Sequence, residues 1–182
     1  MTDLAHLAQL AHLAHPPAAA LNGVLLFALG WAVVTDLRSR RISNRLTYPA
    51  AALGLAVHAA TGGWGGLASS GLGLLLGLGL LLLPFYLGAM GGGDVKLLAA
   101  IGALQGPQFV LMTAVYAGLA GGVLALGYLI RQRGLAAAVR YSAGGWVGGV
   151  RPDAPKAGTI PYGPAIAAGA VIVLLRTALG GL

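Results

Sequence analysis

The sequence contains no cysteine and no glutamate, and only 8% of its residues are charged. The absence of cysteine excludes disulfides, zinc sites built on thiolates and a cysteine nucleophile. Soluble domains carry about 25% charged residues, so a chain of 182 residues with this composition cannot build a water-soluble surface. The composition therefore predicts an integral membrane protein, and basic residues in such a chain record orientation more often than nucleic-acid binding.

Long apolar stretches and 31 glycines take the place of charge. A membrane-spanning helix needs about 20 apolar residues, and we expect such helices to pack through small residues. The pattern predicts an all-α bundle of about six transmembrane segments in a single membrane domain, 1–182. Thr47 is the expected cap of the second segment, and "TGGWGG" is the expected loop after it. The expected spans lie at about 18–35, 47–60, 67–87 and 108–130, with a last one opening at 159–176.

The fourth segment, "VKLLAAIGAL" at 95–104, is shorter than the others. As a helix it would measure about 15 Å, which is too short to cross a bilayer. It is either a half-helix that starts inside the membrane or part of a span extended through "QGPQ". The sequence leaves open whether this segment crosses or re-enters.

Residues 1–17 contain "HLAQLAHLAH", which predicts a short peripheral helix in the membrane interface. Metal binding by His6, His12 and His15 is an alternative, but no carboxylate or cysteine completes such a site. We therefore expect no metal and no cofactor.

Basic residues gather on one side of the predicted membrane domain. Short basic loops stay in the cytoplasm, so this side is the cytoplasmic one, and both termini are expected outside. The loop 131–158 is then a cytoplasmic basic loop, and Arg176 alone lies at the opposite side. The cytoplasmic set is Arg38, Arg40, Arg41, Arg45, Lys96, Arg131, Arg133, Arg140, Arg151 and Lys156.

Two of the four aspartates, Asp36 and Asp94, fall at this cytoplasmic side on different helices. Carboxylates at membrane depth are costly and usually functional. Two carboxylates in contact share one proton, which is the arrangement of an aspartic protease: the ionised group takes a proton from water and the protonated group donates to the scissile carbonyl. The preceding glycines, Gly91, Gly92 and Gly93, can adopt positive φ and let a substrate backbone approach.

Purely structural interpretations of the same residues remain open. Asp94 is a favourable residue for the start of a helix, and it could pair with Lys96. Asp36 could be a solvated helix-end residue neutralised by Arg38, Arg40 or Arg41.

Three stretches resemble one known family. "GGGD" followed by "VKLLAAIGA" resembles the Gly-x-Gly-Asp motif of the type IV prepilin peptidases, "DLRSRRISNRLTYP" is similar to their first-aspartate motif, and "IPYGPAIAAGA" looks like the entry to their last helix. The matches occur in family order and cover about residues 20–178.

The resemblance implies an aspartic endopeptidase of the inner membrane that removes the leader peptide of prepilins at the cytoplasmic face. Asp36 and Asp94 fall on the catalytic aspartates, and Gly91 and Gly93 on the motif glycines. The chain lacks the cysteine-rich insertion of bifunctional members, so we expect no methyltransferase activity, and its compact form is similar to the peptidases of tight-adherence (Flp-type) pili. The supporting residues on these motifs are Lys96, Arg41, Asn44, Pro161 and Gly163.

Two other classes of function remain as alternatives. A small proton-coupled transporter would also pair membrane aspartates, but "GLGLLLGLGLLLLPFYL" offers no polar residue between Ser70 and Tyr86. A non-catalytic membrane subunit of pilus assembly would tolerate loss of both carboxylates. The sequence identifies neither the particular prepilin nor the oligomeric state.

Overall fold

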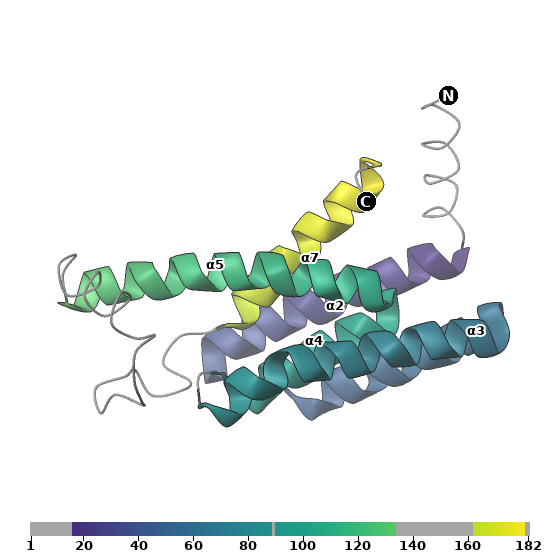
Figure 1. The fold of residues 1–182 in the computed structure, drawn as a ribbon, viewed down its shortest axis with the longest axis horizontal. Coiled ribbons are helices and arrows are strands. Elements are labelled where there is room, and N and C mark those ends of the chain that lie inside the picture. The colour runs from purple at the N-terminus through teal and green to yellow at the C-terminus, as the bar shows by residue number, and fades with distance from the viewer. Residues whose placement is uncertain (1–15, 89, 134–161, 181–182) are drawn as a thin grey trace.

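The computed structural model describes residues 16–88, 90–133 and 162–180. Within these ranges the chain is helical and contains no strand, as expected. Residues 1–15 of the peripheral segment 1–17, residues 134–158 of the basic loop, and Pro161 lie outside the described residues. The five helices are α2 (Pro16–Ser39), α3 (Asn44–Tyr86), α4 (Gly92–Gln105), α5 (Pro107–Arg133) and α7 (Gly163–Ala178) (Figure 1).

Three of these helices are long and apolar enough to cross a membrane. They are α2 over Ala18–Ser39, α3, and α5 over Pro107–Gly127, while α7 is apolar but shorter. The lipid-facing character is visible in their exposed side chains, such as Phe27, Leu75 and Val123. The composition and the fold therefore agree on a membrane protein.

The 43-residue helix α3 consists of two helices joined across a kink at Gly63. Gly63 adopts φ 56°, a conformation that favours glycine. Just beyond the kink, a Cβ on Gly66 would lie 2.1 Å from the His58 carbonyl oxygen, so the chain doubles back on itself. We call residues 44–62 the first arm of α3 and residues 64–86 the second arm. The loop expected at 61–66 is thus a kink within a continuous helical hairpin.

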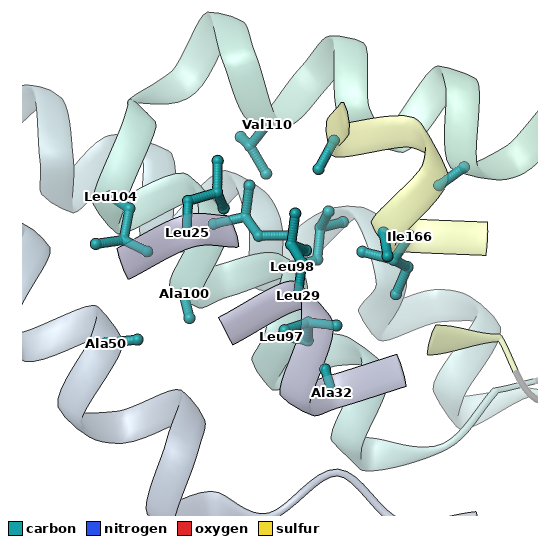
Figure 2. Packing of buried hydrophobic residues seen from close by; sticks show 14 of the residues in the cluster. Leu25, Leu29, Ala32, Ala50, Leu97, Leu98, Ala100, Leu104, Val110 and Ile166 are labelled. Atoms are coloured by element: carbon teal, nitrogen blue, oxygen red, sulfur yellow. The ribbon is translucent and has the colours of Figure 1, made fainter. Parts of the chain in front are cut away.

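Both arms of α3 pack on α4, which is the most buried helix of the bundle (Figures 1 and 2). Gly54 of the first arm meets the backbone of Ala103, and Gly73 of the second arm meets that of Gly102, with virtual Cβ positions 2.5 and 2.1 Å from the carbonyl oxygens. Close backbone packing through small residues is typical of membrane helices. On the other side of α4, the core contains Leu25 and Leu29 of α2, Val110 of α5, and Ile166 of α7.

Several expected boundaries shift. The first helix runs to Ser39, so Asp36 lies in its last turns rather than after it. The second begins at Asn44 and is capped by Ser43, whose hydroxyl accepts the Arg45 N–H at 3.2 Å. Thr47 is therefore an internal, buried residue and not the cap, because the helix starts one turn earlier than the apolar run suggests.

The short fourth segment is a separate helix. α4 ends at Gln105, Gly106 adopts φ 86°, and α5 starts at Pro107. A continuous span through "QGPQ" is excluded because Gly106 reverses the chain and Pro107 opens the next helix, where its missing N–H costs nothing.

Candidate active site

Asp36 lies on α2 with a buried carboxyl group, only 6% of the residue being exposed. Its Oδ2 accepts the backbone N–H of Gly163, the first residue of α7, at 2.9 Å. The first N–H groups of a helix have no partner within the helix and favour negative charge. The start of α7 therefore holds the Asp36 carboxylate, although 127 residues separate the two in the sequence.

Asp94 lies in the first turn of α4 and is 8% exposed. The helix begins after Gly91, and the Asp94 Oδ2 accepts the Gly91 N–H at 3.1 Å. A carboxylate in the first turn complements the helix dipole. The capping role considered for Asp94 is thus present in the structure, and it coexists with the proximity of a second carboxylate.

The electrostatics of Asp94 connect it to Asp36. Asp94 lies outside the three candidate membrane spans. Burial, and after it the charge of Asp36, raises the pKa of Asp94, while the hydrogen bond from Gly91 opposes both, and together they bring the pKa to about 6. Burial, followed by the charge of Asp94, also raises the pKa of Tyr162, which therefore keeps its hydroxyl proton. Asp36, Asp94 and Tyr162 thus share one electrostatic environment.

The three glycines before Asp94 contact the rest of the protein. A Cβ on Gly93 would lie 3.0 Å from the Ile42 Cβ, and one on Gly92 would lie 3.3 Å from the Phe85 ring. A Cβ on Gly91 would lie 3.3 Å from the Asp94 Oδ2. None of the three has a positive φ, which occurs instead at Gly88. In this structure they make room for neighbouring side chains; their use by a substrate stays a prediction.

Two of the supporting residues lie together at the edge of this region. The Lys96 ammonium donates to Asn44 Oδ1 at 2.9 Å and lies 5.5 Å from the centre of the Tyr48 ring. Lys96 thus ties the start of α4 to the start of α3. Arg41 is exposed in the link between α2 and α3.

Gly163 of α7 was among the predicted supporting residues and binds Asp36, but sequence reasoning missed Tyr162 and the part that α5 contributes. The Tyr162 hydroxyl donates to the Ala117 carbonyl at 3.1 Å, and Gly121 lies directly under the Tyr162 ring. The aromatic residue stood in the quoted "IPYGP" stretch, but no signal pointed to Gly121 among so many glycines. Within the described residues, no group of three His, Cys, Asp or Glu side chains could hold a metal ion.

Two buried carboxylates at helix ends, brought together inside an apolar bundle, define a membrane protein with a candidate acid–base site. A model of the type IV leader peptidase family matches residues 23–126, more than half of the chain. The chain belongs to this family of peptidases, and both aspartates lie within the matched region. No curated protein and no solved structure matches the chain.

Proposed function

We propose that this protein is a membrane aspartic endopeptidase that removes the short leader peptide of type IV prepilins of the Flp type at the cytoplasmic face. The observation that carries the proposal is the pair of buried carboxylates on α2 and α4, close enough for the charge of Asp36 to raise the pKa of Asp94. The pair lies in a chain of a peptidase family. No methyltransferase activity is part of the proposal.

The chemistry requires one ionised and one protonated carboxyl group. The ionised carboxylate takes a proton from water, whose oxygen adds to the scissile carbonyl carbon, while the protonated carboxyl donates its proton to the carbonyl oxygen. Collapse of this tetrahedral intermediate returns a proton to the leaving nitrogen, so that the C–N bond breaks into a carboxylic acid and an amine. We expect the two carboxyl groups to lie within hydrogen-bonding reach of one water.

The surroundings of the two groups suggest which one carries the proton. The Gly163 N–H donates to Asp36 Oδ2, so the start of α7 holds this oxygen in place. Asp94 keeps its proton to a higher pH than an ordinary aspartic acid because it is buried beside that charge. In the proposed cycle Asp36 therefore starts as the base and Asp94 as the acid.

The proposal places the chain in the inner membrane with the site at the cytoplasmic face and both termini outside. In the proposal the two arms of α3 count as two segments, and α2, α5, α7 and the short α4, whose first turn with Asp94 lies at the cytoplasmic surface, bring the total to about six. The 43 helical residues of α3 have a combined length of about 65 Å, which is enough for two crossings of a bilayer about 30 Å thick. Reporter fusions after Arg45 and Arg140 should read cytoplasmic, and one after Gly63 external. An external result at Arg45 would overturn this orientation.

The test of the proposed chemistry replaces each carboxylate by its amide. Asp36→Asn and Asp94→Asn should each lower cleavage of a co-expressed Flp-type prepilin at least about 10²-fold, because Asn cannot exchange the proton. Both variants should insert and fold, as gel filtration in detergent would show. The gel shift of the prepilin reports cleavage. Normal processing by Asp94→Asn would rule out the peptidase mechanism and would favour a transporter or an assembly subunit.

A further inference from the structure

An aromatic side chain, that of Tyr162, connects the start of α7 with α5. The Tyr162 hydroxyl donates to the Ala117 carbonyl at 3.1 Å. Its ring fills the space that a side chain at Gly121 would need, since a Cβ there would lie 2.1 Å from a ring carbon and 2.7 Å from the hydroxyl oxygen. Tyr162 thus makes a hydrogen bond and a steric contact with the same face of α5, one turn apart.

The residue that follows in the chain is the one that binds Asp36. The Gly163 N–H donates to Asp36 Oδ2 at 2.9 Å, and a Cβ on Gly163 would lie 2.8 Å from that same oxygen. The hydrogen bond therefore depends on a close approach of the α7 backbone to the carboxylate. Because the peptide unit links the two residues rigidly, displacement of the Tyr162 backbone displaces the Gly163 N–H.

General packing of α7 on α5 is provided elsewhere. A Cβ on Gly169 would lie 2.7 Å from both the Thr113 carbonyl oxygen and the Ala117 nitrogen, so the two backbones already meet along the middle of α7. The contact of Tyr162 with Gly121 is additional to that packing and lies at the end of α7 that faces the carboxylates. This location is the reason to assign it a role in the site.

We propose that Tyr162 is a positioning residue, which rests on Gly121 and the Ala117 carbonyl and thereby holds the Gly163 N–H on Asp36. Gly121 is required for the same contact, because only a residue without a side chain leaves room for the Tyr162 ring. The inference rests on the proposed peptidase function, in which Asp36 activates water. Helix α5, which supplies no carboxylate of its own, then sets the orientation of a catalytic group on α2.

The first experiment compares two neighbouring glycines of α5. Gly121→Ala places a methyl group in the space that the Tyr162 ring occupies. Gly122→Ala adds the same group where nothing lies within 4 Å. Using the purified full chain and a synthetic Flp-type prepilin peptide, we expect Gly121→Ala to lower kcat about 10²-fold with little change in KM, since small misplacements of a catalytic group cost about that much. Gly122→Ala should match the wild type. Equal kcat values for the two variants would overturn the proposal.

The second experiment tests whether the effect passes through the Tyr162 side chain. Tyr162→Phe keeps the ring and loses only the hydrogen bond to Ala117, so it should lower kcat about fivefold. Tyr162→Ala should resemble Gly121→Ala, and the double variant should be no worse than Tyr162→Ala alone, because the contact is already lost. Additive losses in the double variant would contradict the proposal.

A third measurement needs no activity. In the full chain in detergent micelles, the amide proton resonance of Gly163 reports its hydrogen bond to the carboxylate, with Asp36→Asn as the reference for its loss. Gly121→Ala should shift this resonance towards the reference, and Gly122→Ala should not. A loss of kcat in Gly121→Ala with an unmoved Gly163 resonance would refute the positioning role. Failure of the wild type to cleave would instead refute the proposed function, and the resonance would still test the contact.

Discussion

The two ends of α4 are held in different ways. At the C-terminal end, backbones touch directly: Gly73 and Gly102 approach so closely that a Cβ on either would lie 2.1 or 2.0 Å from the other's carbonyl oxygen. Side chains then bind the last carbonyls, with the Ser70 hydroxyl donating to Ala103 at 2.6 Å and His58 Nε2 lying 3.1 Å from the Leu104 oxygen. The hydrogen bonds leave few of the last backbone acceptors of α4 unsatisfied.

At the N-terminal end, side chains make part of the contacts. Gly92 faces the Phe85 ring and Lys96 reaches Asn44, while Gly93 faces the Cβ and the backbone nitrogen of Ile42 at wider distances, 3.0 and 3.2 Å. The Phe85 and Lys96 side chains can adjust by rotation, whereas two backbones in contact cannot. Asp94 is placed at this more adaptable end.

The difference suggests that the two ends of this 14-residue helix have different roles, one in orienting the helix and the other in placing the carboxyl group. Close packing at one end fixes the direction of α4, since a helix is rigid over about 20 Å. The other end holds a buried carboxyl group at a defined place while side chains beside it, such as the Phe85 ring, keep some rotational freedom. Substitutions at the two ends should therefore affect stability and activity unequally.

The largest effect is expected at the C-terminal end. Gly73→Leu would force α3 and α4 apart, because the new side chain would start 2.1 Å from the Gly102 oxygen. We expect a loss of more than about 3 kcal/mol in the free energy of unfolding, and little folded protein after extraction. Gly79→Leu, where nothing lies within 4 Å, is the matched control in the same arm. Similar thermal unfolding of the two variants in detergent would contradict the packing described here.

A smaller effect, mainly on activity, is expected at the N-terminal end. Gly93→Val should lower prepilin cleavage about tenfold or more, because its Cβ would press on Ile42 and displace the start of α4. Gly92→Ala should retain most activity, since its Cβ would lie 3.3 Å from the Phe85 ring, which need give way only slightly, in contrast to the 2.1 Å between a Cβ on Gly121 and the Tyr162 ring.

Ile42→Gly sharpens this prediction, because it removes the Cβ that Gly93 faces. Partial recovery of cleavage in the double variant with Gly93→Val would assign Gly93 to packing against Ile42. No recovery, with both proteins folded, would support the alternative that the glycine admits the substrate backbone.

The smallest effect concerns pH. The pKa of Asp94 is raised from 3.8 to about 6 in the folded protein, so the folded state binds this proton more tightly than the unfolded chain. Its contribution to stability is fully present below about pH 4 and is lost as the pH rises through about 6. The unfolding temperature of the wild type should therefore fall over this range relative to that of Asp94→Asn.

Asp36→Asn provides the control for the cause of that shift. It removes the second contribution to the raised pKa of Asp94 and leaves the larger one, burial. In Asp36→Asn the loss of stability between about pH 4 and 6 should be smaller than in the wild type, but it should not disappear. Parallel pH dependences of wild type and Asp94→Asn would mean that Asp94 does not titrate in this range.

The fold class followed from the sequence because composition and the length of apolar runs are local properties. The apolar runs placed α2, α5 and the two arms of α3 within a few residues. The boundaries failed where polar caps decide them, as at Ser43, or where a helix continues through charged residues, as α2 does to Ser39. The sequence also left open whether residues 95–104 continue through "QGPQ", and the break at Gly106 excludes a continuous helix there.

The sequence by itself determined that this chain has the composition of a membrane protein and that Asp36 and Asp94 are the carboxylates to examine, while the concentration of charge on one side stays a prediction. These conclusions depend on composition and on motifs of adjacent residues. Only the tertiary structure decided that Gly163 binds Asp36, that Tyr162 rests on Gly121, and that Ile42 faces Gly93. Such contacts join residues far apart in the chain. The closest of them are made by glycines, and a glycine has no side chain from which its partner could be predicted.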